Sequence, residues 1–307
     1  MQVAVVVDPE HQRSVLTTIR CATAGFVVGT PAPEQLAADL RLVVVEARRV
    51  EAVLRVLAAT APRARIVILW EAADPALLQL ALQQPSIVGF VGVVDGIPEP
   101  WQLMYAARRV LAPLDPAPLG AQLMPWGATT VSWQPKTTGE LRRIVTQIDG
   151  IGRSLGLGRR EADDLSAAAH ELLMNAMYDA PVDARGRPLY ADDRTAPVQL
   201  APQHAPTLSL CVGPTRMVLD AVDPFGRLPR QRYLEGVIRG IHNQSGPTTL
   251  DTSHGGAGLG LHAMFSSCCM LKAELRPLKS TMVSWMARRG PRSKQRLPRS
   301  LFFLPLM

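Results

Sequence analysis

Four short runs of β-branched and apolar residues recur along the first hundred residues, separated by segments of helical spacing, and this alternation limits the possible folds. The runs occupy residues 3–8, 42–46, 65–70 and 87–94. They are continuous rather than alternating, which is typical of strands buried on both faces of a parallel sheet. A further helix is expected near 100–112. This order predicts βαβ crossovers and a three-layer α/β domain over residues 1–115.

A proline-containing segment follows, and it predicts a linker over residues 116–136. The region after it, residues 137–289, carries helix and strand candidates in separate groups. Its helices are expected at about 138–155, 160–179 and 229–243, its strands at 207–213, 216–223, 270–276 and 280–287, and a glycine-rich loop at 246–260. Helices grouped apart from mostly antiparallel strands predict an α+β sandwich. Residues 290–307 remain as a tail with basic residues and an apolar end.

The bulk composition is that of a packed protein without a membrane span. Of the 307 residues, 47% are apolar and 19% are charged. No apolar run approaches the ~20 residues that cross a bilayer. The first residues lack a basic region before their apolar run, so a cytoplasmic location is expected. The four cysteines have no metal-binding spacing, which predicts reduced, structural thiols.

The net charge of +7 invites a nucleic-acid interpretation, but six of the positive charges are concentrated near the C-terminal end of the chain. They are Arg288, Arg289, Arg292, Lys294, Arg296 and Arg299. Without them the balance is 7 − 6 = +1. A basic tail of this kind is more often a solvated extension. No DNA-reading module is recognisable, so direct nucleic-acid binding is not expected.

A polar pair interrupts the second helix candidate of the 137–289 region. Residues 168–180 read AAHELLMNAMYDA, and Glu171 and Asn175 lie four positions apart on one helix face. Such a pair is either hydrogen-bonded within the core or part of a binding site. The helix alone leaves both interpretations open.

The glycine-rich loop favours a phosphate-binding role. Gly256, Gly258 and Gly260 lead into the apolar stretch LHAMF, so a loop opens a helix whose free N–H groups can hold phosphate oxygens. A dinucleotide-binding fold would need a buried strand directly before these glycines, and SGPTTLDTSH is not one. No P-loop motif is present.

Three segments in order, HELLMNA, VLDAVDPFG and HGGAGLGLHAMF, resemble the ATP-binding domain of the GHKL superfamily, which histidine kinases and anti-sigma-factor serine kinases share. The resemblance covers residues 137–289 and implies a Bergerat-type α+β sandwich with ATP and Mg²⁺ as cofactors. It implies that Asn175 coordinates the Mg²⁺ bridging the phosphates. It also implies that Glu171 orients a hydroxyl or water for attack.

The same resemblance assigns the remaining nucleotide contacts. Asp223 would accept a hydrogen bond from the adenine amino group, with Gly226 in the first glycine motif. The second glycine motif would comprise Gly256, Gly258, Leu259 and Gly260. Two departures stand out: the first motif reads Asp-Pro-Phe-Gly, and Tyr178 replaces the basic or histidine residue that often stands three positions after the asparagine. A plain turn at Asp223–Gly226 is the alternative interpretation.

Within the superfamily, residues 140–176 resemble the opening of the anti-sigma-factor type. That type binds a protein partner, a sigma factor or an anti-sigma antagonist, and some members phosphorylate the antagonist on serine. A non-catalytic ATP-binding adaptor is the first alternative. An orphan histidine kinase using His170 is disfavoured, because the proline that usually follows a phosphoacceptor histidine is missing.

The first domain resembles a response-regulator receiver with a flavodoxin-like fold. Asp8 and Glu10 stand in the acidic region, but Glu46 occupies the acceptor position and Trp70 falls near the hydroxyl position. No lysine follows the last strand. The resemblance therefore implies a degenerate receiver, useful for docking or for forming a homodimer rather than for phosphorylation. Another three-layer α/β fold is the alternative.

Overall fold

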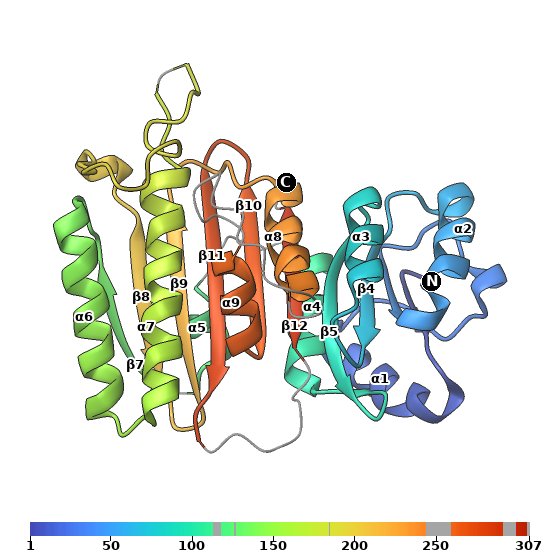
Figure 1. Cartoon of the computed structure of the whole chain (residues 1–307). Coiled ribbons are helices and arrows are strands. Elements are labelled where there is room, and N and C mark those ends of the chain that lie inside the picture. Colours follow the sequence, from blue (N-terminus) through green and yellow to red (C-terminus); the bar gives the residue numbers. More distant parts are fainter. Residues whose placement is uncertain (113–117, 126, 184, 244–258, 291–298, 306–307) are drawn as a thin grey trace. The chain divides into compact units, whose positions relative to one another are not determined.

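A computed structural model describes the chain apart from residues 113–117, 126, 184, 244–258, 291–298 and 306–307. The chain divides into two compact units (Figure 1). Unit 1 comprises Met1–Asp115 together with Gln295–Leu304. Unit 2 comprises Pro116–Lys294 and Pro305–Met307. Among the described residues, no helix combines the length and the apolar character needed to cross a membrane.

Unit 1 contains a parallel sheet in the order β2-β1-β3-β4-β5. Its strands are β1 (Val3–Val6), β2 (Val28–Gly29), β3 (Leu42–Glu46), β4 (Arg65–Trp70) and β5 (Ile87–Val94). Short β6 (Ile97–Pro98) and β12 (Ser300–Pro305) both pair antiparallel with β5. The helices are α1 (Pro9–Ala22), α2 (Val50–Thr60), α3 (Pro75–Gln83) and α4 (Pro100–Leu111).

The four sequence runs of unit 1 coincide with β1, β3, β4 and β5, whose residues are almost all buried. The structure differs from the sequence prediction at the end of the chain. Residues 290–307 were expected to be a tail, but Ser300–Pro305 forms β12, with Leu301 opposite Phe90. An apolar SLFF segment gains hydrophobic stabilisation by joining a sheet, which explains the difference.

Unit 2 is built on an antiparallel sheet in the order β10-β11-β9-β8-β7. Its strands are β7 (Thr129–Trp133), β8 (Thr207–Val212), β9 (Arg216–Asp223), β10 (Met270–Arg276) and β11 (Ser280–Arg288). The helices are α5 (Leu119–Leu123), α6 (Thr138–Ser154), α7 (Arg159–Met174), α8 (Arg230–Asn243) and α9 (Leu259–Ser267). In Figure 1, α6, α7 and α9 lie over one face of this sheet.

The two faces of the unit 2 sheet have different coverings. The indole of Trp285 on β11 donates a hydrogen bond to the carbonyl oxygen of Met264 on α9, at 3.1 Å, so Trp285 faces α9. Its neighbour Ser284 pairs with Asp220 on β9 and therefore points to the opposite face. Asp220 accepts hydrogen bonds there from the backbone of α5. The proline-containing segment expected to be a linker thus supplies both a helix and, in β7, an edge strand.

Candidate functional site

The helix that carries the polar pair ends in a wider turn. The first turn of α7 is capped by Glu161, whose carboxylate accepts a hydrogen bond from the Gly158 N–H at 3.0 Å. Leu165 and Leu172 of this helix are buried. After Met174 the chain continues as a π-helical turn, Asn175–Asp179. Such turns are rare and occur frequently at functional sites. The sequence predicted one uninterrupted helix to residue 179.

Glu171 and Gly260 lie in direct contact, which brings the asparagine helix and the start of α9 together. A Cβ at Gly260 would lie 1.9 Å from the carboxyl carbon of Glu171, so no other residue fits at Gly260 without moving the carboxylate. The Asn175 amide donates to Glu171 Oε1 at 3.2 Å. Gly256 and Gly258 lie outside the described residues, and so does the side chain of Leu259.

The Asp223–Gly226 segment forms a tight turn in which the aspartate side chain participates. Asp223 Oδ1 accepts hydrogen bonds from the N–H groups of Phe225 and Gly226, at 2.9 and 3.2 Å. Gly226 has a φ of +62°, and a Cβ there would lie 2.1 Å from the Arg276 carbonyl oxygen. Glycine is therefore required at Gly226. Asp223 belongs both to this turn and to the wall of a cavity.

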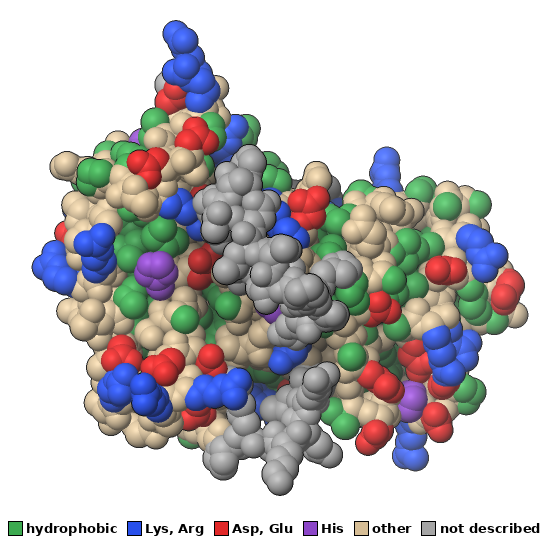
Figure 2. Space-filling model, in the orientation of Figure 1, with side chains coloured by type: hydrophobic (Ala, Val, Ile, Leu, Met, Phe, Trp, Pro, Cys, Tyr) green, Lys and Arg blue, Asp and Glu red, His purple; other side chains and the backbone are tan. Residues whose placement is uncertain are grey.

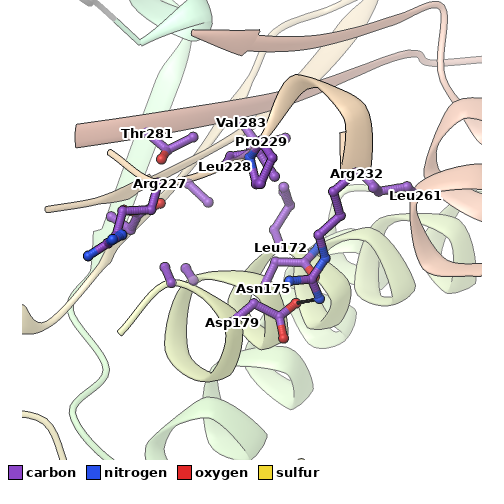
Figure 3. Close-up of a pocket in the computed structure, with 14 residues that line it drawn as sticks. Leu172, Asn175, Asp179, Arg227, Leu228, Pro229, Arg232, Leu261, Thr281 and Val283 are labelled. Carbon is purple, nitrogen blue, oxygen red and sulfur yellow. Dashed lines mark ion pairs between the residues drawn. The ribbon is translucent and has the colours of Figure 1, made fainter. Parts of the chain in front are cut away.

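One cavity of unit 2 joins the sheet and the asparagine helix (Figure 3). It is lined by residues of α7 and the π-helical turn, β9, β11, the segment before α8, α8 and α9. The polar and charged ones are Asn175, Asp179, Asp223, Arg227, Arg232 and Thr281. The free space that water can reach is about 60 Å³, enough for a few water molecules.

Two carboxylic acids at this site have raised pKa values. Burial raises the pKa of Glu171, and the neighbouring Arg194 and the Asn175 amide partly oppose that shift. Burial also raises the pKa of Asp223, against the hydrogen bonds that its carboxylate accepts from Phe225 and other groups. Carboxyl groups with perturbed pKa values around a cavity are candidates for functional residues.

A cluster of opposite charges lies beside Asn175. Asp179 forms ion pairs with two guanidinium groups, those of Arg194 and Arg232; the Arg232 contact is 3.0 Å long and drawn in Figure 3. Arg194 Nη2 also donates to the Asn175 amide oxygen at 3.3 Å. The Asn175 oxygen, to which the resemblance assigns Mg²⁺, therefore contacts a guanidinium group. As arranged, these residues do not fit a divalent cation, because two arginines already neutralise Asp179.

A second hollow lies on the other side of Glu171, between α7 and α9. It is lined mainly by small side chains, including Ala167 and Ala263, and also by His170, Glu171 and Gly260. The side chain of His170 is exposed at the edge of the hollow, and partial desolvation, aided by the positive charge of Arg194, lowers its pKa. Because Glu171 borders this hollow and its neighbour Asn175 borders the cavity, a group bound in one could approach a group bound in the other.

The sequence prediction missed four residues in or beside the cavity that Asn175 and Asp223 line. They are Asp179, Arg194, Arg232 and Thr281. Asp179 could have been found, because it follows Asn175 at the same four-residue spacing that separates Asn175 from Glu171. Thr281 lies opposite Asp223 in the β9–β11 register, which sequence spacing does not reveal. Nothing distinguishes Arg194 from the other arginines of its loop.

The ends of the parallel strands in unit 1 carry the residues that the receiver resemblance singled out. Asp8, His11 and Glu46 have ligand atoms within 4.8 Å of one another. Glu46, at the end of β3, accepts hydrogen bonds from the Asp8 N–H at 2.9 Å and from Arg48 at 3.2 Å. Arg48 and Arg49 also form ion pairs with Asp8. The acidic groups are thus neutralised by arginines of their own chain.

Comparisons with known proteins give little beyond the geometry. No protein-family model matches the sequence, and no curated protein matches it. Among solved structures, the chain is similar to one described as the SiaB-SiaC complex from Pseudomonas aeruginosa. The identity is 14%, the TM-score is 0.34, and the match covers 52% of this chain and 88% of the other.

Proposed function

We propose that this protein is a signalling regulator of the anti-sigma-factor type, in which unit 2 binds ATP and captures a protein partner. The partner class that fits the resemblance is a sigma factor or an anti-sigma antagonist. Mg²⁺ is not part of this proposal, because the residues around Asn175 do not fit it as arranged.

The observation that carries the proposal is the cavity that joins Asn175 to Asp223. These two residues lie 48 positions apart, on the asparagine helix and on β9, yet both line one enclosed space. Apolar side chains such as Leu172 and Val283 complete its wall. An apolar cavity with a few convergent polar groups is typical of small-molecule sites. The Glu171–Gly260 contact adds the start of α9, whose N-terminal end suits phosphate.

Isothermal titration with ATP tests the proposal. We expect wild-type protein to bind ATP, and we expect Asn175→Ala and Asp223→Asn each to weaken binding by about tenfold or more, since each removes a polar contact in an enclosed site. Asp163→Asn is the matched control, because Asp163 lies on the exposed side of α7, outside the cavity. An absence of binding by the wild type, or equal affinity of the wild type and Asn175→Ala, would contradict the proposal.

The second candidate is an adaptor that binds ATP without transferring phosphate. The Arg194–Asn175 contact favours it, because phosphoryl transfer ordinarily relies on a metal bridging the phosphates. Incubation with γ-labelled ATP and a candidate partner separates the two. Labelled partner that disappears with Glu171→Gln identifies a kinase, whereas partner binding without label identifies the adaptor.

For unit 1 we propose a receiver-like domain that positions or regulates unit 2 without being phosphorylated. The strand order β2-β1-β3-β4-β5 supports this, since flavodoxin-like folds have it. Glu46 ends β3 at the acceptor position and is bound by its neighbours, His11 at 3.0 Å among them. A glutamate already paired with histidine and arginine is a poor phosphoryl acceptor.

A further inference from the structure

The arginines beside Asn175 suggest how a triphosphate would be neutralised in unit 2. Arg194 makes two kinds of contact: an ion pair with Asp179 and a hydrogen bond to the amide oxygen of Asn175. Both partners line the cavity. Arg232 reaches Asp179 from α8. Two guanidinium groups therefore share one carboxylate, and either can exchange it for a phosphate oxygen while the other keeps Asp179 paired.

Arg194 is held in place by the anchoring of its loop, residues 181–206. Its neighbour Asp193 accepts hydrogen bonds from the Thr195 N–H and hydroxyl, at 2.8 and 2.6 Å. The Tyr178 hydroxyl donates to the Ala196 carbonyl oxygen at 3.0 Å. Arg194 itself is only 14% exposed. A guanidinium fixed in this way loses little conformational freedom when a ligand binds.

The tyrosine at position 178 explains why the positive charge beside Asn175 comes from Arg194. In the family that the sequence resembles, a basic or histidine residue often stands at the position of Tyr178. The tyrosine therefore removes one possible contact with phosphate. In the structure Tyr178 is buried, and its hydroxyl group binds the loop that carries Arg194. The positive charge missing at position 178 is thus supplied from position 194, whose guanidinium group contacts Asn175.

Resting on the proposed ATP-binding function, we propose that Arg194 takes the place of a bound Mg²⁺ at Asn175, so that unit 2 binds nucleotide triphosphates without a divalent metal. The guanidinium group donates to the phosphate oxygens directly and repels a second cation from the Asn175 oxygen. Asp179 then keeps Arg232 as its partner. Arginine suits this role because its planar donors match phosphate oxygens in pairs.

The test compares ATP binding by the full chain in EDTA and in excess Mg²⁺, by isothermal titration. We expect similar dissociation constants for the wild type in both buffers. Arg194→Ala is expected to weaken binding by about tenfold or more in EDTA. Arg194→Lys keeps the charge but loses the paired donors, so its affinity should lie in between.

The control is Arg187→Ala in the same loop. Arg187 is 70% exposed and pairs with Asp183, and Figure 2 shows basic side chains at the tip of this loop projecting into solvent. We expect this variant to bind like the wild type. Thermal melts check that each variant folds, and the wild-type comparison of the two buffers needs no variant at all.

The outcomes separate the inference from the function on which it rests. Wild-type binding that requires Mg²⁺, or binding in EDTA that Arg194→Ala leaves unchanged, would overturn the role of Arg194 while ATP binding stands. If the wild type binds ATP in neither buffer, the proposed function itself fails.

Discussion

Glu171 occupies an environment that disfavours its own charge. Its carboxylate lies against the backbone of Gly260, where nothing larger than glycine leaves room for it. Burial raises its pKa, and the positive charge of Arg194 reduces that shift without cancelling it. A group held in this way lowers the stability of the folded state when it is ionised, which is a known pattern at functional sites.

Replacing Glu171 with glutamine should therefore stabilise the protein at neutral pH. Because the folded pKa is raised, the native state binds more protons than the unfolded state between the two pKa values, and stability falls as pH rises through that window. Glutamine removes the charge and keeps an oxygen that can accept from Asn175. We expect a higher Tm for Glu171→Gln at neutral pH, and a gain that shrinks as pH falls from the raised folded pKa towards the ordinary carboxyl pKa.

Calorimetric melts over a pH series measure this difference. Glu235→Gln on α8 is the control, because its carboxylate contacts only Gln231 among the hydrogen bonds described. It should not reproduce the pH-dependent gain. A lower Tm for Glu171→Gln at neutral pH would mean that the Arg194 attraction outweighs burial.

Some of the residues around the cavity could be predicted from the sequence. Glu171 and Asn175 follow from helical spacing, and the structure places Gly260 against the first and Asp223 across the cavity from the second. The role of Arg194 could not be predicted from the sequence, because its approach to Asn175 depends on the path of a long loop. Spacing predicts which side chains share a helix face, but it does not predict where a loop folds back.

Among helices and strands, the sequence predicts those whose own residues form an apolar pattern and misses those that depend on distant contacts. Buried strands such as β3 and β9 were located to within a residue or two, because each is a short run of mostly apolar residues. β7 was missed. Its TTVSW sequence is largely exposed and lies among prolines, so it lacks the hydrophobic signal of a strand. It forms because β8 offers it a full ladder of hydrogen bonds.

The five-residue helix α5 was missed for a related reason. A helix that short is unstable by itself and depends on its contacts. The buried carboxylate of Asp220 on β9 provides them. It accepts from the N–H groups of Leu119 and Gly120, at 2.9 and 3.0 Å, and from the Ser284 hydroxyl.

Asp220→Ala should detach α5 from the sheet. The change leaves two buried N–H groups without an acceptor, so we expect a loss of about 2–4 kcal/mol in the free energy of unfolding. Asp220→Asn keeps one side-chain oxygen and should cost less. Urea denaturation measures both variants. A loss within about 0.5 kcal/mol for the alanine variant would contradict this account of α5.

At the scale of the whole molecule, unit 1 is built from two separate stretches of the chain. The sequence predicted a domain ending at residue 115, yet β12 from the far end joins β5. Further contacts support this. The Trp70 indole donates to the Arg299 carbonyl oxygen at 2.8 Å, and the Gly92 N–H donates to the Ser300 hydroxyl at 3.0 Å. The late residues therefore belong to the first unit.

A substitution of Phe302 on β12 tests whether this strand contributes to the packing of unit 1. It is fully buried, its ring lies 6.0 Å from that of Tyr105, and Gly89 on β5 leaves the space that it fills. Phe302→Ala should destabilise unit 1 by about 3–5 kcal/mol, because it leaves a cavity at the centre of the β5–β12 contact. Val94→Ala, at an exposed position of β5, is the matched control.

Calorimetry together with ATP titration distinguishes the two units in this experiment. If β12 is part of unit 1, Phe302→Ala lowers the melting transition of that unit, while the cavity of unit 2, which contains no residue of β12, keeps its affinity for ATP. A variant as stable as the wild type would mean that β12 contributes no packing to unit 1. The sheet of residues 1–115 would then be sufficient by itself, as the sequence alone had suggested.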